Sequence, residues 1–473
     1  MLGYKRMSLK RSLSFFDLVN IIIGSIVGAD IYIASALTAG MVGPLAIFVW
    51  VIAGVFAMIL ALIFAYSSYY VPRVGGPFAF VSKAFDKFYG FLTGWSMWIA
   101  EIIALPVFAI AFVQYLHYFV QLEFWQEVLV KACFLFGLTF VNVIGVKKAG
   151  KLNDILTIVK LSPLLVFIVA GIVFFILNPN VIQQNYAPLA PLGFANFGTA
   201  TVLIFWAYVG FEMGTLPASE VKNPKTTIPK AIITGLLIVI AFYLSTNFVL
   251  FGASNWNDLS KTSIPLVFVS MITLGSIGAI MMGAGALVSV SGSNESGILG
   301  IARLSYAMSI KGLFPKIFSK VHPKYKTPYM ALVIQGAIAF VLSIYGGITQ
   351  LISFSVFNMA FAFLLVCLSL LVLKRESETR LHAQHILPWI GIAICVYLLY
   401  STSNFDKIVG GIIILLGIPL YFFFSPKTDI HHLKEMFLSE EAIFVRRLEH
   451  HEKFLAHFVK MCHRLYKKSK KNK

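Results

Sequence analysis

The sequence predicts an all-α, polytopic membrane protein, and three observations carry that prediction. Of the 473 residues, 59% are hydrophobic and only 12% are charged, with a mean hydropathy of +0.84. A soluble protein of this composition could not cover its own surface with polar side chains. Runs of about 20 apolar residues, the length that a helix needs to cross a bilayer, recur along the chain. Two of these runs are interrupted by glycine at matching places. We therefore expect the lipid bilayer to surround most of the chain.

The apolar runs divide the chain into twelve predicted transmembrane helices. They lie at about 15–38, 43–70, 88–120, 126–146, 152–177, 196–217, 229–252, 264–292, 328–345, 348–373, 386–401 and 408–424. Connections 71–87 and 293–327 carry Lys and Arg, whereas connection 178–195 carries neither. Because basic residues favour the cytoplasmic side, we expect a multi-pass protein of the cell membrane with both termini in the cytoplasm.

The distribution of polar residues predicts three parts. A cytoplasmic N-terminal arm covers 1–14, the transmembrane domain covers 15–425, and a basic cytoplasmic tail covers 426–473. Apolar residues recur at helical spacing in the tail, which predicts a helix there. The formal net charge of +18 lies mostly in the arm, the tail and the predicted cytoplasmic loops. That placement argues for membrane topology and against a nucleic-acid partner.

Two glycine-broken apolar segments begin the two halves of the transmembrane domain. The first is Gly24-Ser-Ile-Val-Gly28-Ala-Asp30, and the second is Gly210-Phe-Glu212-Met-Gly214. Five apolar segments start with each, which predicts repeat one at about 15–177, repeat two at about 196–373 and extra helices at about 386–424. A broken helix survives in a bilayer only where its free N–H and C=O groups face protein, ligand or water. Matched breaks in two halves indicate a secondary transporter with its substrate site at the breaks.

The first break supplies candidate substrate-binding groups. Free N–H groups attract anions and free C=O groups attract cations, so a zwitterion such as an amino acid suits a broken helix. The candidates are Gly24, Ser25, Val27, Gly28, Ala29 and Asp30. Gly24 and Gly28 alone could form a helix-packing face. A carboxylate such as Asp30 inside a span is costly and usually functional, which favours a binding site.

The second break and the third span add further candidates. They are Trp206, Ala207, Tyr208 and Gly210 at the second break and Glu101 in the third span. Trp206 could close over a substrate and stack on a cationic group, or serve as a core aromatic residue. Glu212 lies within the sixth span and is a candidate proton carrier or gate.

Lys160 is the one basic residue deep in a predicted span. A buried ammonium group must be paired, hydrogen-bonded or deprotonated, unless its side chain reaches the membrane surface. If Lys160 is protonated on one side of the membrane and loses its proton on the other, it would couple proton binding to a change of state. The candidate coupling or gating residues are Lys160, Glu212, Ser291, Ser293 and Glu295.

These motifs resemble those of the amino acid–polyamine–organocation superfamily of permeases. The segments that carry the resemblance are Gly24–Tyr32, Phe205–Glu212, Glu220–Lys225 and Gly300–Met308, and the likeness extends to about residue 425. The resemblance implies a five-plus-five inverted repeat with spans one and six broken, followed by two further helices. It also implies transport of amino acids, polyamines or related cations, often with proton coupling or by exchange. Lys160 falls where a fifth-span lysine stands in for a sodium ion in some members. The resemblance therefore implies that Lys160 lies near the backbone at Gly24 and near Ser291 or Ser293 of the eighth span.

Two residues depart from the superfamily pattern. The superfamily usually has glycine at the position of Asp30, where a backbone N–H meets the substrate carboxylate, and commonly an aromatic residue at the position of Glu101. A substrate carboxylate about 4 Å from an ionised Asp30 would be repelled by roughly 4 kcal/mol at an effective dielectric near 20. Either Asp30 is protonated or paired, with Lys160 or Asn358 as partners, or the substrate is a cationic amine.

We therefore expect a permease that moves an amino acid or related organic amine by alternating access, coupled to protons or working by exchange. One alternative is a polyamine or monoamine carrier. Another is a membrane nutrient sensor that does not transport. The sequence holds no metal-ligand cluster and no nucleophile–base pair, so we expect neither an enzyme nor a bound metal or cofactor.

Overall fold

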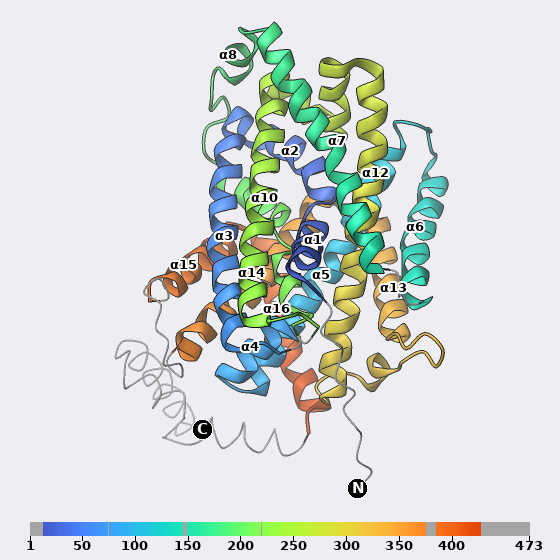
Figure 1. The fold of residues 1–473 in the computed structure, drawn as a ribbon, viewed down its shortest axis with the longest axis vertical. Helices are drawn as coiled ribbons and strands as arrows, with labels where there is room; N and C mark the ends of the chain where they lie inside the picture. The colour runs from blue at the N-terminus through green and yellow to red at the C-terminus, as the bar shows by residue number, and fades with distance from the viewer. Residues whose placement is uncertain (1–12, 74, 145–148, 219, 375–384, 427–473) are drawn as a thin grey trace.

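The computed structural model describes residues 13–426, except 74, 145–148, 219 and 375–384 (Figure 1). In chain order the α-helices are α1 (Phe15–Ile26), α2 (Ala29–Val42), α3 (Ala46–Tyr70), α4 (Gly76–Ala84), α5 (Lys87–Leu116), α6 (Phe124–Ile144), α7 (Ala149–Leu177), α8 (Val181–Tyr186), α9 (Phe197–Ala207), α10 (Pro224–Ala253), α11 (Trp256–Lys261), α12 (Pro265–Ile310), α13 (Tyr329–Tyr345), α14 (Ile348–Leu373), α15 (Leu387–Ser401) and α16 (Asn404–Phe424). Short 3-10 helices are η1 (Gly43–Leu45), η2 (Phe211–Thr215) and η3 (Lys316–Ser319). The predicted tail, from 427 on, and most of the predicted arm lie outside the described residues.

The prediction of an all-helical, polytopic membrane protein is confirmed. Within the described residues, 9 helical segments are long and apolar enough to cross a membrane, and one of them, Phe15–Tyr70, contains α1, α2 and α3. The shorter apolar helices α13 and α15 occupy the places of predicted spans nine and eleven. The count of twelve spans stays a prediction.

Both predicted breaks are present. The first lies between α1 and α2, where Val27 is extended and Gly28 has φ −149° and ψ −140°. The second lies between α9 and η2, where Gly210 has φ +125°, a conformation that favours glycine. The two breaks therefore come from glycines in matching segments of the two halves.

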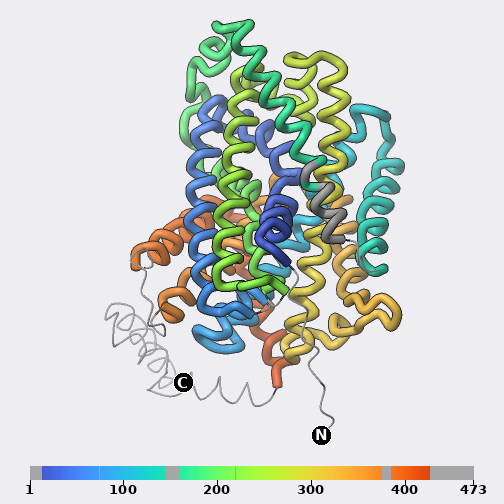
Figure 2. The backbone as a smooth tube through the Cα atoms, in the orientation of Figure 1, coloured from blue at the N-terminus to red at the C-terminus, as the bar shows by residue number. Residues whose placement is uncertain are grey.

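The two halves pack through corresponding spans. In each of the following pairs the first helix belongs to a span of the first half and the second to the corresponding span of the second half: α2 with α9, α3 with α10, α5 with α12, and α6 with α13. Figure 2 shows this interleaving, with blue α3 beside green α10 and teal α6 beside orange α13. An odd number of spans in a repeat turns the next repeat upside down in the membrane, which is the inverted arrangement of such transporters.

The structure corrects the predicted end of the eighth span. The sequence analysis ended it at 292 and assigned 293–327 to a connector, but α12 continues to Ile310. No proline occurs between Pro265 and Pro315, so nothing in the sequence forces the helix to stop earlier. Helices α4 and α8 also form inside segments that the sequence analysis treated as loops. Glycine at the N-cap of α4, with φ +110°, and proline in its first turn explain where α4 begins.

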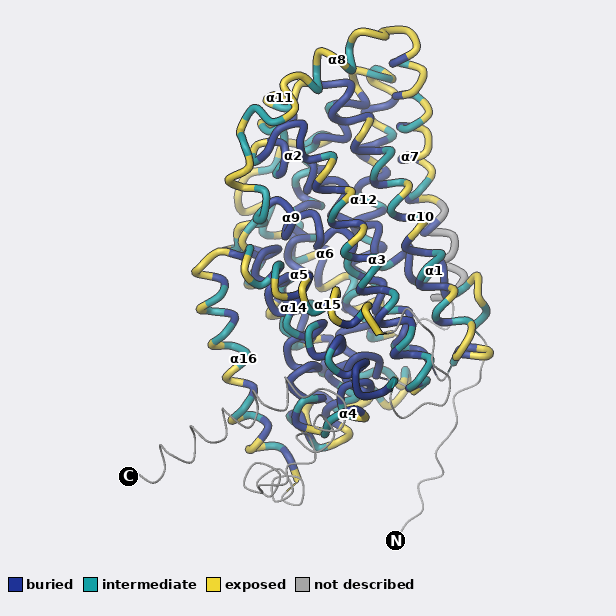
Figure 3. The backbone as a smooth tube through the Cα atoms, turned by 90° about the vertical axis from the view of Figure 1, so that its left-hand side faces the viewer, coloured by how far each residue is buried: buried dark blue, intermediate teal, exposed yellow. Residues whose placement is uncertain are grey.

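Burial separates the centre of the bundle from its periphery. Helices α9 and α14 are largely buried, whereas α6 and α16 expose most of their apolar side chains (Figure 3). In a bilayer, exposed apolar faces contact lipid, so α6 and α16 form part of the lipid-facing rim. The broken spans lie inside that rim.

Candidate functional site

A cavity of about 50 Å³ lies where the two broken spans meet. Its walls come from the first break, α5, the second break with η2, α12 and α14. The lining residues are Ser25, Ile26, Asp30, Glu101, Ala104, Leu105, Phe108, Trp206, Val209, Gly210, Met213, Ser293, Gly297, Ser355 and Met359. A water molecule needs about 10–15 Å³ of such volume, so the cavity in this state has room for only a few waters.

The two breaks touch each other through Gly210. A Cβ atom at Gly210 would lie 3.1 Å from the backbone nitrogen of Ile26 and 3.1 Å from the carbonyl carbon of Ser25. Glycine is therefore required at this position both by its positive φ and by the close approach of the first break. The contact holds the two irregular segments together at one wall of the cavity.

A carboxylate caps each break in the same way. The backbone N–H of Gly28 donates to Asp30 Oδ1 at 2.8 Å. The backbone N–H of Gly210 donates to Glu212 Oε2 at 3.0 Å. In both halves the glycine and the carboxylate are two residues apart, so each break satisfies one freed N–H group with its own side chain.

Asp30 lines the cavity and has a second partner. The hydroxyl of Tyr243 donates to Asp30 Oδ2, and it also lies 3.2 Å from the carbonyl oxygen of Ile26. Within the described residues Asp30 forms no ion pair with Lys160, and the side-chain amide of Asn358 donates instead to Phe354 O at 3.0 Å. The two pairings that the sequence analysis considered for Asp30 are therefore wrong, since Tyr243 on α10 takes that place.

Lys160 joins α7 to the first break and to α12. Its Nζ donates to Gly24 O at 2.5 Å and to Ser293 Oγ at 3.2 Å, and its side chain is 2% exposed. Ser293 Oγ lies 2.5 Å from Val27 O, and Ser289 Oγ lies 3.3 Å from the same oxygen. The carbonyl groups freed by the first break thus face an ammonium group and two hydroxyls.

The other two α12 candidates lie differently. Ser291 donates to Leu287 O of its own helix at 2.7 Å, because two positions along a helix turn a side chain by about 200° away from Ser293. Of the two serines that the sequence analysis considered near Lys160, Ser293 is the one that contacts it. Glu295 lies within electrostatic range of Lys160 and Arg303.

Glu101 and Glu212 come from different spans and lie within electrostatic range of each other. Glu101 on α5 lines the cavity, whereas Glu212 is not among the lining residues. Glu212 is fully buried, and its Oε1 has no hydrogen-bond partner among the described residues. Sequence reasoning placed both residues inside spans but not beside one another.

Several predicted binding residues do not line the cavity. They are Gly24, Val27, Gly28, Ala29, Ala207 and Tyr208. Tyr208 points toward α3, where its hydroxyl donates to Trp50 O at 3.2 Å and its ring packs edge-on against Trp50. The Gly28 Cα faces Ser293 and Phe108, because a Cβ there would lie 2.7 Å from Ser293 Cβ and 2.8 Å from Phe108 Cε1. These candidates lie outside the wall of this cavity, and their role in substrate binding stays a prediction.

Sequence reasoning also missed part of the wall. Ala104, Leu105 and Phe108 follow Glu101 at spacings of three, four and seven, so they share its face of α5. That spacing was visible in the sequence once Glu101 was chosen. Phe108 packs against Trp206, with ring centroids 5.9 Å apart. Ser355 and Met359 of α14 had no comparable signal in the sequence.

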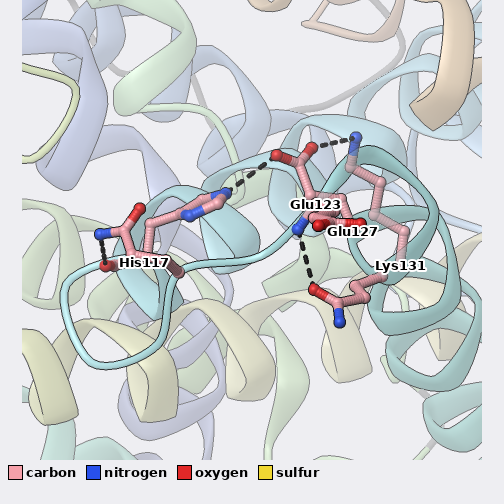
Figure 4. Close-up of polar contacts among 6 residues, drawn as sticks. His117, Glu123, Glu127 and Lys131 are labelled. Atoms are coloured by element: carbon pink, nitrogen blue, oxygen red, sulfur yellow. Dashed lines mark hydrogen bonds and ion pairs between the residues drawn. The ribbon is translucent and has the colours of Figure 1, made fainter.

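A separate polar cluster joins the end of α5 to α6 (Figure 4). Glu127 Oε1 lies 2.9 Å from His117 Nε2, and Glu127 Oε2 lies 3.7 Å from Lys131 Nζ. Glu123 lies beside this cluster, and its backbone N–H donates to Gln126. These side chains are not among those that line the cavity. In the part of the chain that the structure describes, no group of three or more His, Cys, Asp or Glu residues could hold a metal ion.

Comparison with known proteins gives a consistent family assignment. Residues 13–430 match the family model described as amino acid permease. The chain is 26% identical over 443 residues to the branched-chain amino acid permease BcaP of Bacillus subtilis, covering 89% of this chain and 94% of that protein. It is 26% identical over 443 residues to the serine/threonine exchanger SteT of Bacillus subtilis, covering 88% and 97%. It is also 26% identical over 451 residues to the methylthioribose transporter of Bacillus subtilis, covering 90% and 96%.

Proposed function

The chain belongs to the amino acid permease family, whose members are transporters and not enzymes, and we propose that it moves an amino acid or a related organic amine by alternating access. The observation that carries this proposal is the cavity at the contact between the two broken spans. Irregular backbone inside a membrane requires a polar partner, and a substrate is the partner that a transporter supplies there. We propose a location in the cell membrane with both termini in the cytoplasm.

The substrate site consists of the cavity wall at the two breaks. Ser25 and Asp30 contribute from the first break, Trp206 and Gly210 from the second, and Glu101 from α5. The other backbone groups of the first break act from behind this wall, by holding Lys160 and Ser293. The relatives named as an amino acid permease and as an exchanger support an amino acid substrate and either transport mode.

Coupling to protons would act through Lys160. When protonated, Lys160 makes charge-assisted hydrogen bonds that tie α7 and α12 to Gly24 of α1. A neutral amine makes weaker bonds, so loss of the proton releases α1 from α7 and α12. A ligand that changes which state is preferred shifts the population between the inward-open and outward-open forms. On α12, Ser293 takes part because it accepts a hydrogen bond from that ammonium, and Glu295 because its charge interacts with it.

A carrier of polyamines or monoamines is the second candidate. It is favoured by the two carboxyl groups of Asp30 and Glu101 in the cavity wall. It is also favoured by the caps at Gly28 and Gly210, because N–H groups already bound to carboxylates are not free for a substrate carboxylate. An ammonium group without a neighbouring carboxylate suits such a wall.

Uptake into proteoliposomes tests the proposal. The purified chain is first screened for thermal stabilisation by single amino acids and by their decarboxylated amines, since a ligand that binds the folded state stabilises it. Labelled ligands that stabilise the chain are then offered to proteoliposomes with and without a proton gradient, and with and without internal ligand. Saturable uptake supports transport, and its dependence on the gradient or on internal ligand separates proton coupling from exchange. Binding without uptake would favour a sensor.

A further inference from the structure

A second and larger cavity lies on the outside of the helix bundle. It is a groove of about 410 Å³ between α3, α7 and α10, and it shares no lining residue with the cavity at the breaks. Helix α10 forms its floor, because α3 and α7 each pack against α10 (Figure 1). Every lining residue is apolar except Ser245. Water needs two to four polar partners, so a groove of this composition suits an apolar occupant.

The shape of the groove follows the helix axes. Each of the three helices lines it with residues one turn apart, which are Ile47 and Val51 on α3, Ile168 and Ile172 on α7, and Leu244 and Phe248 on α10. Helices that cross a bilayer are tilted by only about 20° from its normal on average. The groove therefore runs nearly parallel to the acyl chains of the surrounding lipid, and one extended chain matches its direction.

The groove opens toward the side of the protein that faces the bilayer. Val51, Ile172 and Phe248 are 42%, 50% and 43% exposed, whereas Val249 at the floor is 1% exposed. Exposed apolar side chains of membrane-spanning helices contact lipid. The groove is thus continuous with the lipid-facing surface of the bundle, and lipids are the molecules that reach it from the side.

An aromatic pair marks the end of the groove nearest the membrane surface. Tyr186 on α8 stacks on Phe248 with ring centroids 6.0 Å apart, and its hydroxyl donates to Phe248 O at 3.3 Å. Helix α8 follows the end of α7, and tyrosine is enriched at the level of the lipid headgroups. The connection 178–195, which carries Tyr186, contains no Lys or Arg that would select an anionic headgroup. These features suit a zwitterionic phospholipid whose headgroup lies beside Tyr186.

The helices that flank the groove also hold the first break. Helix α7 carries Lys160 and α10 carries Tyr243, and both side chains donate hydrogen bonds to backbone carbonyl groups of that break. The two helices touch directly beside the groove, where Gly171 leaves no room for a Cβ against Val249. A chain that fills the groove next to this contact therefore supports the spacing between α7 and α10.

We propose that the groove binds one acyl chain of a zwitterionic phospholipid, and that the bound chain stabilises the arrangement of α7 and α10 around the first break. Lipid chains are as apolar as the groove, so the hydrophobic effect does not distinguish the bound chain from the bulk bilayer. Close packing along three helices does, because many small dispersion contacts add up. The bound lipid should therefore leave the protein more slowly than the lipids around α6 and α16.

Photolabelling of the unsubstituted full chain in proteoliposomes tests the site. The probe is phosphatidylcholine with a diazirine in the middle of one acyl chain, and mass spectrometry maps the labelled peptides. One sample is irradiated in the membrane and another after transfer into lipid-free detergent. We expect label on 47–51, 168–172 and 244–249 in both samples, and label on α16 in the first sample only. Loss of both labels on transfer would overturn the proposal, and so would retention of a diazirine-bearing free fatty acid without retention of the phospholipid.

Two valines one turn apart on α3 supply matched substitutions. Val51 lines the groove, whereas Val55, on the same face and 51% exposed, does not. Val51→Phe places a ring in the groove and should lower the retained label by about tenfold or more, because the ring and the chain compete for one space. Val55→Phe should retain as much label as the unsubstituted chain. Equal retention in the two variants would count against the groove.

Thermal unfolding in detergent tests the stabilising role. A ligand that binds the folded state raises its melting temperature. Added phosphatidylcholine should therefore stabilise the unsubstituted chain and Val55→Phe, but not Val51→Phe. Ser245→Phe, which fills the groove from α10, should behave like Val51→Phe and provides the test if that variant does not fold. An equal rise in melting temperature in all the folded variants would refute the role of the groove.

Discussion

Asp30 and Lys160 act on the same turn of the first broken span without touching each other. In a regular helix the N–H of Gly28 would donate to the C=O of Gly24. Here Asp30 Oδ1 accepts that N–H, and Lys160 Nζ donates to that C=O. Side-chain bonds thus replace the missing helical hydrogen bond at both ends: Asp30 binds the N–H, and Lys160, with Ser293 Oγ at 3.0 Å, binds the C=O. A substitution at either residue therefore leaves the other residue to stabilise the broken turn without it.

Removing the Asp30 carboxylate should change which ligand charge the cavity prefers. Asp30→Gly frees the Gly28 N–H and removes a negative charge from the wall. We expect amine binding to weaken and neutral amino acid binding to improve, with their affinity ratio shifting by about tenfold or more, because a like-charge repulsion of several kcal/mol is relieved. Asp30→Asn keeps a cap on Gly28 and should lose amine affinity only. The measurement compares leucine with isoamylamine, and an unchanged ratio in Asp30→Gly would show that Asp30 does not sense substrate charge.

Removing Lys160 should uncouple or abolish transport in a protein that still folds. Lys160→Ala leaves Gly24 O and Ser293 Oγ without their ammonium partner. Hydrogen bonds to a charged group contribute about 1.5–3 kcal/mol, so we expect proton-driven uptake to fall by about tenfold or more. The control is Lys131→Ala, which removes another buried lysine, next to Glu127 and away from the breaks. Uptake at the unsubstituted rate in Lys160→Ala, with the gradient dependence intact, would exclude the role.

Adding one methyl group at Gly210 should damage the contact between the breaks. Gly210→Ala is strained by its positive φ, at a cost of about 1–2 kcal/mol, and its Cβ would press on the Ser25–Ile26 backbone. We expect a lower melting temperature and a marked loss of uptake. Gly411→Ala, on α16 with no atom within 4 Å of the added Cβ, should be neutral or slightly stabilising. Equal behaviour of the two variants in thermal unfolding and uptake would contradict the tight contact.

The stability of the α12 end should depend on alkaline pH through Lys311. Partial burial, and then Lys87 and Arg73 nearby, lower the pKa of the Lys311 ammonium below its ordinary value of 10.5. The unfolded chain therefore binds this proton more tightly than the folded chain. The protonated Lys311 destabilises the folded state fully at pH values below its folded-state pKa, and this destabilisation disappears as the pH rises toward 10.5. We expect the melting temperature of the unsubstituted chain to rise relative to Lys311→Met across that interval. Lys320→Met, at another exposed lysine, is the control, and a pH-independent difference for Lys311→Met would refute the prediction.

The sequence was most informative where a residue type conflicts with its surroundings. Glycines inside apolar runs located both breaks, and a lone lysine in a span indicated that it needed backbone and hydroxyl partners. These signals are local, because a free carbonyl group or a buried ammonium group is costly wherever the rest of the chain lies. The broken, all-helical architecture could therefore be predicted without any knowledge of the packing.

What the sequence could not provide depends on orientation and on contacts between spans. Tyr208 was assigned to the cavity by its position next to Trp206, but its side chain points to Trp50 because the backbone turns at the break. The approach of Glu101 to Glu212 and the place of Ser355 follow from how α5, η2 and α14 pack. In a uniformly apolar chain the hydrophobic pattern does not distinguish a face toward lipid from a face toward protein, so such neighbours cannot be inferred from spacing.

The Glu127 cluster has a mechanical consequence for the carrier. It fastens the end of α5, the helix that bears Glu101 and Phe108, to α6 at the lipid-facing rim. A tilt of that end of α5 therefore carries the start of α6 with it, because His117 contacts Glu127 and the connection between the two helices is short. The free energy of opening the cavity then includes the cost of moving α6 in the bilayer. That cost depends on the lateral pressure and the hydrocarbon thickness of the membrane.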